Sequence, residues 1–276
     1  MELLRRKLST AMAVTLATAL TLVAGPLAAA GVGLQWFGQA AFKITTPGGK
    51  VIVIDPFITK NPKTPAEHKD LTKLGKVDLL LVTHGHGDHV GDTVAIANAT
   101  GAKVGINADM GRTFASLGWL GMKQMIRFNK SGPIKPLEGI TVTMVRAEHS
   151  SEVAYKDPAT GKETMHPGGE PAGYIIELEN GFKIYHAGDT GVFADMAFIS
   201  SYYAPDLALL PIGGHFTMDP THAGYAVREL LKTPTVIPMH YGTFGLLKGT
   251  PDEFKKALGN SKTKVVVMTP GESRKF

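Results

Sequence analysis

The chain has 276 residues, a length that suits one large domain or two small ones. Hydrophobic residues make up 43% of it and charged residues 19%, a composition that excludes an intrinsically disordered protein. The net charge of +5 is mild and no long basic run is present, so nucleic acid is not expected as the main partner.

The sequence contains no cysteine. This absence excludes disulfides, thiol nucleophiles and thiolate metal ligands together. Stability must therefore come from a hydrophobic core, which a domain of this length is large enough to supply.

The first 30 residues have the layout of a secretory signal peptide. Residues 5–7 are basic, and the next charged residue is Lys43. An apolar stretch over residues 8–24 follows, and small residues precede a candidate cleavage site after Ala30. The alternative is an uncleaved membrane anchor, but a stretch of about 17 residues lies near the lower limit for a spanning helix. We therefore expect residues 1–30 to be removed, leaving a periplasmic or secreted protein without stable membrane insertion.

Residues 31–276 alternate between strand-like and helix-like patterns, which predicts one α/β domain. Apolar runs bounded by turn residues predict strands over residues 33–44, 50–54, 77–82, 102–106, 125–128, 140–145, 173–179, 182–186, 206–211, 235–238 and 264–268, the last of the series. Helical patterns fall over residues 92–100, 109–117, 192–200, 221–231 and 251–258.

Two segments fit neither pattern. Residues 61–76 are polar and contain proline, which indicates a surface loop with a short helix. Residues 150–171 are rich in glycine, proline and charge, and they are too long for a simple connection. We expect this second segment to form a functional flap.

A histidine-rich motif, His84-Gly85-His86-Gly87-Asp88-His89, directly follows the predicted strand at residues 77–82. In an extended segment, residues i and i+2 point the same way, so His84 and His86 can share one metal ion. The two glycines allow a tight turn, after which Asp88 and His89 can face a second ion. Nitrogen and carboxylate ligands suit Zn²⁺, and also Fe or Mn²⁺.

Three further candidate ligands each follow a predicted strand: His149, Asp189 and His240. The ends of successive strands in an α/β sheet bring side chains to one edge, where sites are usually built. The alternative is a set of solvated loop histidines and turn aspartates, which so many suitable residues at strand ends disfavours. The sequence therefore predicts a dinuclear metal site.

Four other residues near predicted strand ends are candidates for supporting roles. His215 could bind substrate or move a proton, or it could be an ordinary loop histidine. Asp55 could orient a ligand histidine or cap a turn. His186 alternates with Ile184, which favours packing over metal binding, and Tyr241 is a candidate hydrogen-bond donor to an oxyanion.

The spacing of these residues resembles the metallo-β-lactamase superfamily, whose fold is two β-sheets sandwiched between helices. The segments 172–174, 186–190, 211–218 and 238–243 resemble a bacterial branch of metal-dependent hydrolases. That branch is related to L-ascorbate-6-phosphate lactonase and, more distantly, to N-acylphosphatidylethanolamine phospholipase D. The resemblance covers residues 31–276 and implies an α/β (α+β) protein with a four-layer αββα sandwich.

The resemblance also implies roles for the candidate ligands, with Asp189 bridging two divalent ions. The first ion would be held by His84, His86 and His149, and the second by Asp88, His89 and His240. Such a pair, expected to be Zn²⁺ with Mn²⁺ or Fe as alternatives, generates a hydroxide by lowering the pKa of water toward ~7. Asp88 is the natural proton acceptor, with a role purely as a ligand as the alternative, and His215 is the second catalytic candidate.

Residue types narrow the branch. Lactamases with a cysteine ligand are excluded because the chain has no cysteine. The all-histidine β-lactamases generally lack the bridging carboxylate, so Asp189 disfavours β-lactamase activity. The oxygen-reducing di-iron branch carries glutamate where this chain has His86, which disfavours a redox function.

The sequence therefore predicts a metal-dependent hydrolase that acts on a small-molecule ester, lactone or phosphodiester. One alternative is a nucleotide phosphodiesterase or nuclease, which the weak positive charge disfavours. Another is a non-catalytic metal-dependent binding protein, which the complete ligand set disfavours. The oligomeric state stays open, with a homo-oligomer among the alternatives.

Overall fold

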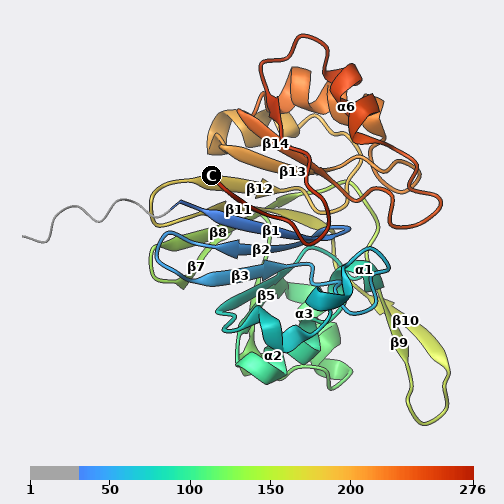
Figure 1. Ribbon diagram of the computed structural model, residues 1–276. Helices are drawn as coiled ribbons and strands as arrows, with labels where there is room; N and C mark the ends of the chain where they lie inside the picture. The colour runs from blue at the N-terminus through green and yellow to red at the C-terminus, as the bar shows by residue number, and fades with distance from the viewer. Residues whose placement is uncertain (1–30) are drawn as a thin grey trace, which may run out of the picture.

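A computed structural model describes residues 31–276 and places two seven-stranded β-sheets face to face, with helices on both outer surfaces (Figure 1). This order of helix, sheet, sheet and helix confirms the αββα sandwich. The predicted signal peptide, residues 1–30, lies outside the described residues. Within residues 31–276, none of the helices has the length and apolar character needed to cross a membrane.

The first sheet has the strand order β16-β1-β2-β3-β4-β5-β6. Its strands are β1 (Gly33–Gly38), β2 (Ala41–Thr45), β3 (Val51–Ile54), β4 (Leu79–Val82), β5 (Lys103–Asn107), β6 (Met125–Phe128) and β16 (Ser273–Lys275). Strands β3 to β6 pair in parallel. Parallel neighbours need crossover connections, and α2 (Thr93–Thr100) and α3 (Ala108–Ser116) supply two of them.

The second sheet has the order β15-β14-β13-β12-β11-β8-β7. Its strands are β7 (Pro133–Leu137), β8 (Ile140–Arg146), β11 (Ala172–Glu177), β12 (Lys183–His186), β13 (Leu207–Pro211), β14 (Thr235–Met239) and β15 (Lys264–Val265). Strands β12 to β15 are parallel. Their crossovers contain α4 (Met196–Phe198) with the π-helical η4 (Ile199–Tyr203), α5 (Pro220–Tyr225) with the π-helical η5 (Ala226–Leu231), and α6 (Pro251–Leu258).

Strand β4 shows why the central strands are apolar throughout. Leu79 and Leu81 pack between the two sheets, whereas Leu80 and Val82 pack beneath the outer helices. All four side chains are fully buried, because alternate residues of a strand point to opposite faces and both faces are covered. The buried strand ends abruptly at Thr83, and the histidine motif begins at the edge of the sandwich.

The first predicted strand, residues 33–44, is wrong in one respect. The structure divides it into β1 and β2, which pair antiparallel around a tight turn at Gln39 and Ala40. Gln39 adopts a left-handed backbone conformation with φ 51°, and the register of the pair is irregular between Trp36 and Gly38. The turn brings a polar residue to the same edge of the sheet as the histidine motif.

Two further strands of the sandwich were not predicted, and the end of the chain differs from expectation. Strand β7 lies at an edge of its sheet, and β16 follows the predicted last strand, of which only β15 forms. Strand β16 pairs with β1, and the backbones of Val32 and Phe276 exchange two hydrogen bonds of 2.9 Å. The first strand of the sandwich is therefore held by the far end of the sequence.

The segment predicted as a flap is a β-hairpin. Strands β9 (Glu152–Lys156) and β10 (Glu163–Pro167) form a separate two-stranded sheet that projects from the body near α1 (Gly87–Val90) (Figure 1). The loop at residues 61–76 contains two short 3₁₀ helices, η1 (Ala66–His68) and η2 (Leu71–Leu74); a third, η3 (Met122–Gln124), precedes β6.

Candidate metal centre

The predicted ligands lie together where strand ends of both sheets meet. His84 follows β4, His149 follows β8, Asp189 follows β12 and His240 follows β14. The structure brings all seven candidate ligands into two compact groups. Within each group, the ligand atoms all lie within 4.8 Å of one another. We call them the three-histidine group (His84, His86 and His149) and the aspartate–histidine group (Asp88, His89, Asp189 and His240).

The glycines of the motif allow this convergence. A side chain at Gly85 would place its Cβ 2.6 Å from the carbonyl oxygen of Glu152, so only glycine lets the β9 backbone come this close. The short helix α1 then begins at Gly87 and presents Asp88 and His89. The motif thus changes direction within a few residues, and its side chains divide between the two groups.

The three-histidine group is uncharged in the metal-free protein. His84 Nε2 lies 2.9 Å from His86 Nδ1, and the His84 and His149 rings are 5.1 Å apart. Burial, reinforced by the neighbouring His89, lowers the pKa of His84 well below its usual value, and burial also lowers the pKa of His86 and His149. Neutral imidazole is the form that binds a metal ion.

The aspartate–histidine group carries opposite charges in close contact. Asp189 Oδ2 lies 2.9 Å from His240 Nε2 and 3.2 Å from His89 Nε2. Burial alone would lower the pKa of His240, but Asp189 outweighs it and raises that pKa to about 9. Carboxylates likewise raise the pKa of buried His89 well above its usual value. Burial would raise the pKa of Asp189, yet His240 and His89 hold it well below its usual range.

Asp189 also connects the two groups. Its Oδ2 lies 3.7 Å from His149 Nε2, a member of the three-histidine group. No other carboxylate in the described part of the chain lies within 4 Å of histidines from both groups. This is the position expected of a side chain that contacts two ions.

Asp55 orients the motif from beneath. This fully buried carboxylate follows β3 and accepts hydrogen bonds from the Thr83 backbone N–H at 2.8 Å and from the Thr83 hydroxyl at 2.7 Å. It also accepts from His89 Nδ1 at 2.8 Å, which leaves His89 Nε2 facing the aspartate–histidine group. Of the two interpretations of Asp55, orienting a candidate ligand is therefore the better supported.

The donors in the two groups fit divalent metal ions. Asp189 Oδ1 is buried and lacks a hydrogen-bond partner, and buried His89 Nε2 makes no hydrogen bond although it lies 3.2 Å from Asp189 Oδ2. Unpartnered buried polar atoms are rare in native proteins and call for an explanation, such as a bound ion. Imidazole nitrogen and carboxylate oxygen are ligands that Zn²⁺, Mn²⁺ and Fe accept, so the residues present suit the predicted cofactors.

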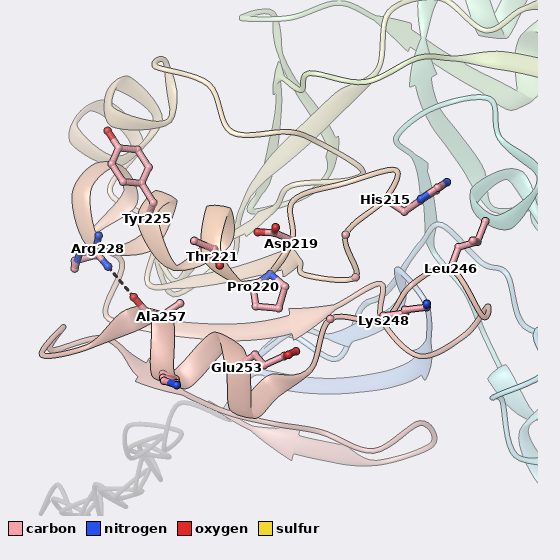
Figure 2. A pocket seen from close by; sticks show the side chains of 14 residues that line it. His215, Asp219, Pro220, Thr221, Tyr225, Arg228, Leu246, Lys248, Glu253 and Ala257 are labelled. Carbon is pink, nitrogen blue, oxygen red and sulfur yellow. Dashed lines mark hydrogen bonds between the residues drawn. The ribbon is translucent and has the colours of Figure 1, made fainter.

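His215 belongs to neither group. It is exposed, has φ 63°, and its ring contacts that of Phe216 at 4.4 Å. It lines a cavity of about 910 Å³ between the loops after β13 and β14 and the helices α5 and α6. Figure 2 shows His215 and Leu246 at the opposite end of this cavity from Tyr225. Of the roles considered for His215, contact with substrate in this cavity fits its position.

His186 packs, as its alternation with Ile184 suggested. It is fully buried, its Nε2 lies 2.9 Å from the Ala40 carbonyl oxygen, and its Nδ1 accepts from the Gly188 backbone at 3.1 Å. Both ring nitrogens are thus occupied, and the ring links the two sheets. Tyr241 packs against Trp36 at 5.6 Å, and burial raises its pKa to about 12, so it keeps its proton at neutral pH.

One residue of the site escaped the sequence analysis. Gln39 is fully buried, and its Nε2 lies 2.8 Å from Asp88 Oδ2 and 2.7 Å from His240 Nε2. The sequence analysis placed Gln39 inside one continuous strand over residues 33–44. The only available signal was Gly38-Gln39, a flexible residue followed by a polar one within a largely apolar run.

Comparisons with known proteins agree with this geometry. A family model described as a beta-lactamase superfamily domain matches residues 50–241. A UPF0173 metal-dependent hydrolase from Polaromonas sp. is 58% identical over 241 residues, covering 87% of this chain and 88% of the relative. One from Rubrobacter xylanophilus is 44% identical over 245 residues, covering 88% and 96%.

A solved structure is also similar to this chain in fold and in sequence. Igni18, a metallo hydrolase from the hyperthermophilic archaeon Ignicoccus hospitalis, is 40% identical and superposes with a TM-score of 0.76, covering 89% of this chain and 98% of its own. The fold and these matches define a metal-dependent hydrolase. The chain belongs to the metallo-β-lactamase superfamily and, within it, to the UPF0173 metal-dependent hydrolases.

Proposed function

We propose that the chain hydrolyses a small ester, lactone or phosphodiester at a centre of two divalent metal ions, with Zn²⁺ as the expected ion. The observation that carries the proposal is the pair of adjoining ligand groups, with Asp189 in contact with histidines of both. The three-histidine group would hold one ion, and Asp88, His89 and His240 the other.

Two divalent ions supply Lewis acidity and a nucleophile at neutral pH. The protein residues position those ions and manage protons. The side chain of Asp88 is 24% exposed, whereas those of His89, Asp189 and His240 are at most 3% exposed. Asp88 is also kept ionised, because His89 and His240 lower its pKa despite its burial. Asp88 is the most exposed member of the group, and we propose that it orients the attacking water and receives its proton.

The surroundings support a substrate with an apolar part. Phe216, Phe244 and Leu246 are all exposed, in loops that follow β13 and β14. The Phe244 ring lies 6.3 Å from that of Phe57, which follows β3. Exposed apolar side chains gathered at one edge are typical of ligand-binding surfaces. This edge favours an ester or lactone with an apolar substituent over a nucleotide.

Metal analysis and a substrate panel test the proposal. Purified protein should contain two Zn²⁺, Mn²⁺ or Fe ions per chain and hydrolyse a lactone or carboxylic ester in preference to a β-lactam, and a chelator should remove that activity. Replacing His86 with alanine should lower the metal content to one ion. Cleavage of cyclic nucleotides or RNA instead would support the nuclease alternative. Two bound ions without turnover would support a binding protein.

We also propose that residues 1–30 direct export and are cleaved after Ala30. The basic start, apolar stretch and small residues of this segment support the proposal. Cell fractionation should find the protein outside the cytoplasm, and sequencing its N-terminus should begin at Gly31. A cytoplasmic protein that starts at Met1 would contradict it.

A further inference from the structure

Gln39 occupies a turn that the surrounding structure holds firmly. It connects β1 and β2 with a φ of 51°, a conformation uncommon for a residue other than glycine. Its carbonyl oxygen accepts hydrogen bonds from the Trp36 indole and from the His240 backbone N–H, each at 3.0 Å. Backbone strain maintained by such contacts often marks a functional position. The turn is therefore joined directly to the strand end that carries a candidate ligand.

The side chain of Gln39 makes two contacts through one atom. Nε2 donates to Asp88 Oδ2 at 2.8 Å and lies 2.7 Å from His240 Nε2. The alternative orientation would place the amide oxygen against the Asp88 carboxylate, where two acceptors would repel. Donation to the ionised Asp88 therefore fixes Nε2 as the donor, and its contact with His240 Nε2 is a hydrogen bond only when that nitrogen is unprotonated, the form that binds a metal.

An amide N–H donates only to a lone pair, and lone pairs on these same two atoms would bind a cation. The Asp88 oxygen has two lone pairs, so it can accept from Gln39 and still bind an ion. The unprotonated His240 nitrogen has one, which must turn from the amide to the ion. Gln39 thus keeps its side-chain hydrogen bond to Asp88 when an ion binds, and its carbonyl oxygen holds the backbone of His240.

We propose that Gln39 is a positioning residue that sets the affinity of the aspartate–histidine group for the second metal ion. This inference rests on the proposed dinuclear centre. Among the described residues, no hydrogen bond joins Gln39 to the three-histidine group, so the first ion should not depend on it. Partners that orient metal ligands from behind typically change metal affinity by about 10–100-fold when removed.

The test uses two variants and a matched control. Gln39→Met keeps the length of the side chain and removes the amide. Gln39→Asn keeps an amide that is too short to reach Asp88, and asparagine tolerates φ near 50° better than glutamine does. Gln35→Met is the control, because Gln35 lies on β1 just before the turn and its Nε2 donates to the Gly271 carbonyl oxygen, away from the ligands.

Each purified protein, freed of metal with a chelator, is titrated with Zn²⁺. Native mass spectrometry counts the bound ions, and competition with a chromophoric chelator measures both affinities. Wild type and Gln35→Met should bind two ions equally well. Both Gln39 variants should bind the first ion normally and the second about 10–100-fold more weakly.

A merely structural role would lower thermal stability and leave the second affinity unchanged. That result in both Gln39 variants would overturn the inference, and so would an equal loss in Gln35→Met. If Gln39→Met fails to fold, Gln39→Asn decides, because its backbone is under less strain. A wild-type protein that binds one ion would overturn the proposed dinuclear centre and this inference together, whereas two ions with unaffected variants would overturn the inference alone.

Discussion

The two ligand groups lie side by side but differ in charge. In the three-histidine group, burial lowers the pKa of every imidazole, so the metal-free group is neutral. In the aspartate–histidine group, carboxylates raise the pKa of both imidazoles, so the metal-free group contains ion pairs. The first group is ready to bind a cation, whereas the second must release protons as the cation binds. Filling of the second group should therefore depend more strongly on pH.

The largest effect is expected at the residue that contacts both groups. Asp189→Asn should lower kcat/KM on the order of 10⁴-fold, as expected for a member of a catalytic unit. The change removes a negative charge within 3.7 Å of three histidines. Kinetics and metal content should both be measured. Asp195→Asn is the control, since Asp195 pairs with Arg146 at the surface; equal activity in the two variants would contradict the bridging role.

A substitution at Asp55 should affect the metal affinity of one group more than that of the other. Asp55→Asn should weaken metal binding by about 10–100-fold, with the larger loss in the aspartate–histidine group, because Asp55 contacts His89 directly. Competition with a chelator measures the loss. Asp78→Asn serves as the control, since Asp78 Oδ2 accepts a hydrogen bond from the Val51 backbone at the opposite end of β3. An equal loss in both groups would mean that Asp55 acts through general stability.

The charge difference predicts how the metal-free protein responds to pH. A histidine whose folded pKa is raised stabilises the protein fully below its ordinary pKa of 6.5, and this stabilisation is lost as pH rises through the folded value. For His240 the loss spans pH 6.5 to about 9. Thermal unfolding in excess chelator should therefore show a falling Tm across this range. His240→Gln should flatten the slope, and a wild-type Tm independent of pH there would argue against the ion pairs.

The smallest effect is expected at His215, outside both groups. His215→Ala should leave metal content unchanged and reduce kcat/KM by about fivefold, the loss of one hydrogen bond of about 1 kcal/mol to substrate. His222→Ala is the control, because His222 is an exposed histidine that pairs with Asp219. A loss of metal or a collapse of kcat in His215→Ala would move His215 into the centre itself.

The ligand groups could be predicted because their determinants are local. His84 and Asp189 each lie a few residues after an apolar strand, and strand ends of an α/β fold meet at one edge. The fold followed from the same pattern, since a continuous apolar run such as Leu79–Val82 requires cover on both faces.

The features that the sequence did not predict depend on contacts between residues that are far apart in the sequence. Strand β7 contains Pro133 and Pro136, which disfavour a strand except at a sheet edge, the position that β7 occupies. Strand β16 has three exposed residues and forms only because β1 is beside it. Gln39 contacts Asp88 and His240, which lie 49 and 201 positions away, so its role has no local signal.

The pairing of β16 with β1 has a consequence for how the enzyme assembles. The strand that leads to Gln39 is the first of the sandwich to leave the ribosome, yet its outer neighbour is among the last. Closing a loop of this length is entropically costly and slows folding. The Gln39 turn gains its full support only when residues 273–276 have joined the sheet. Complete formation of the proposed second metal site should therefore be a late event, after the histidine motif is already in place.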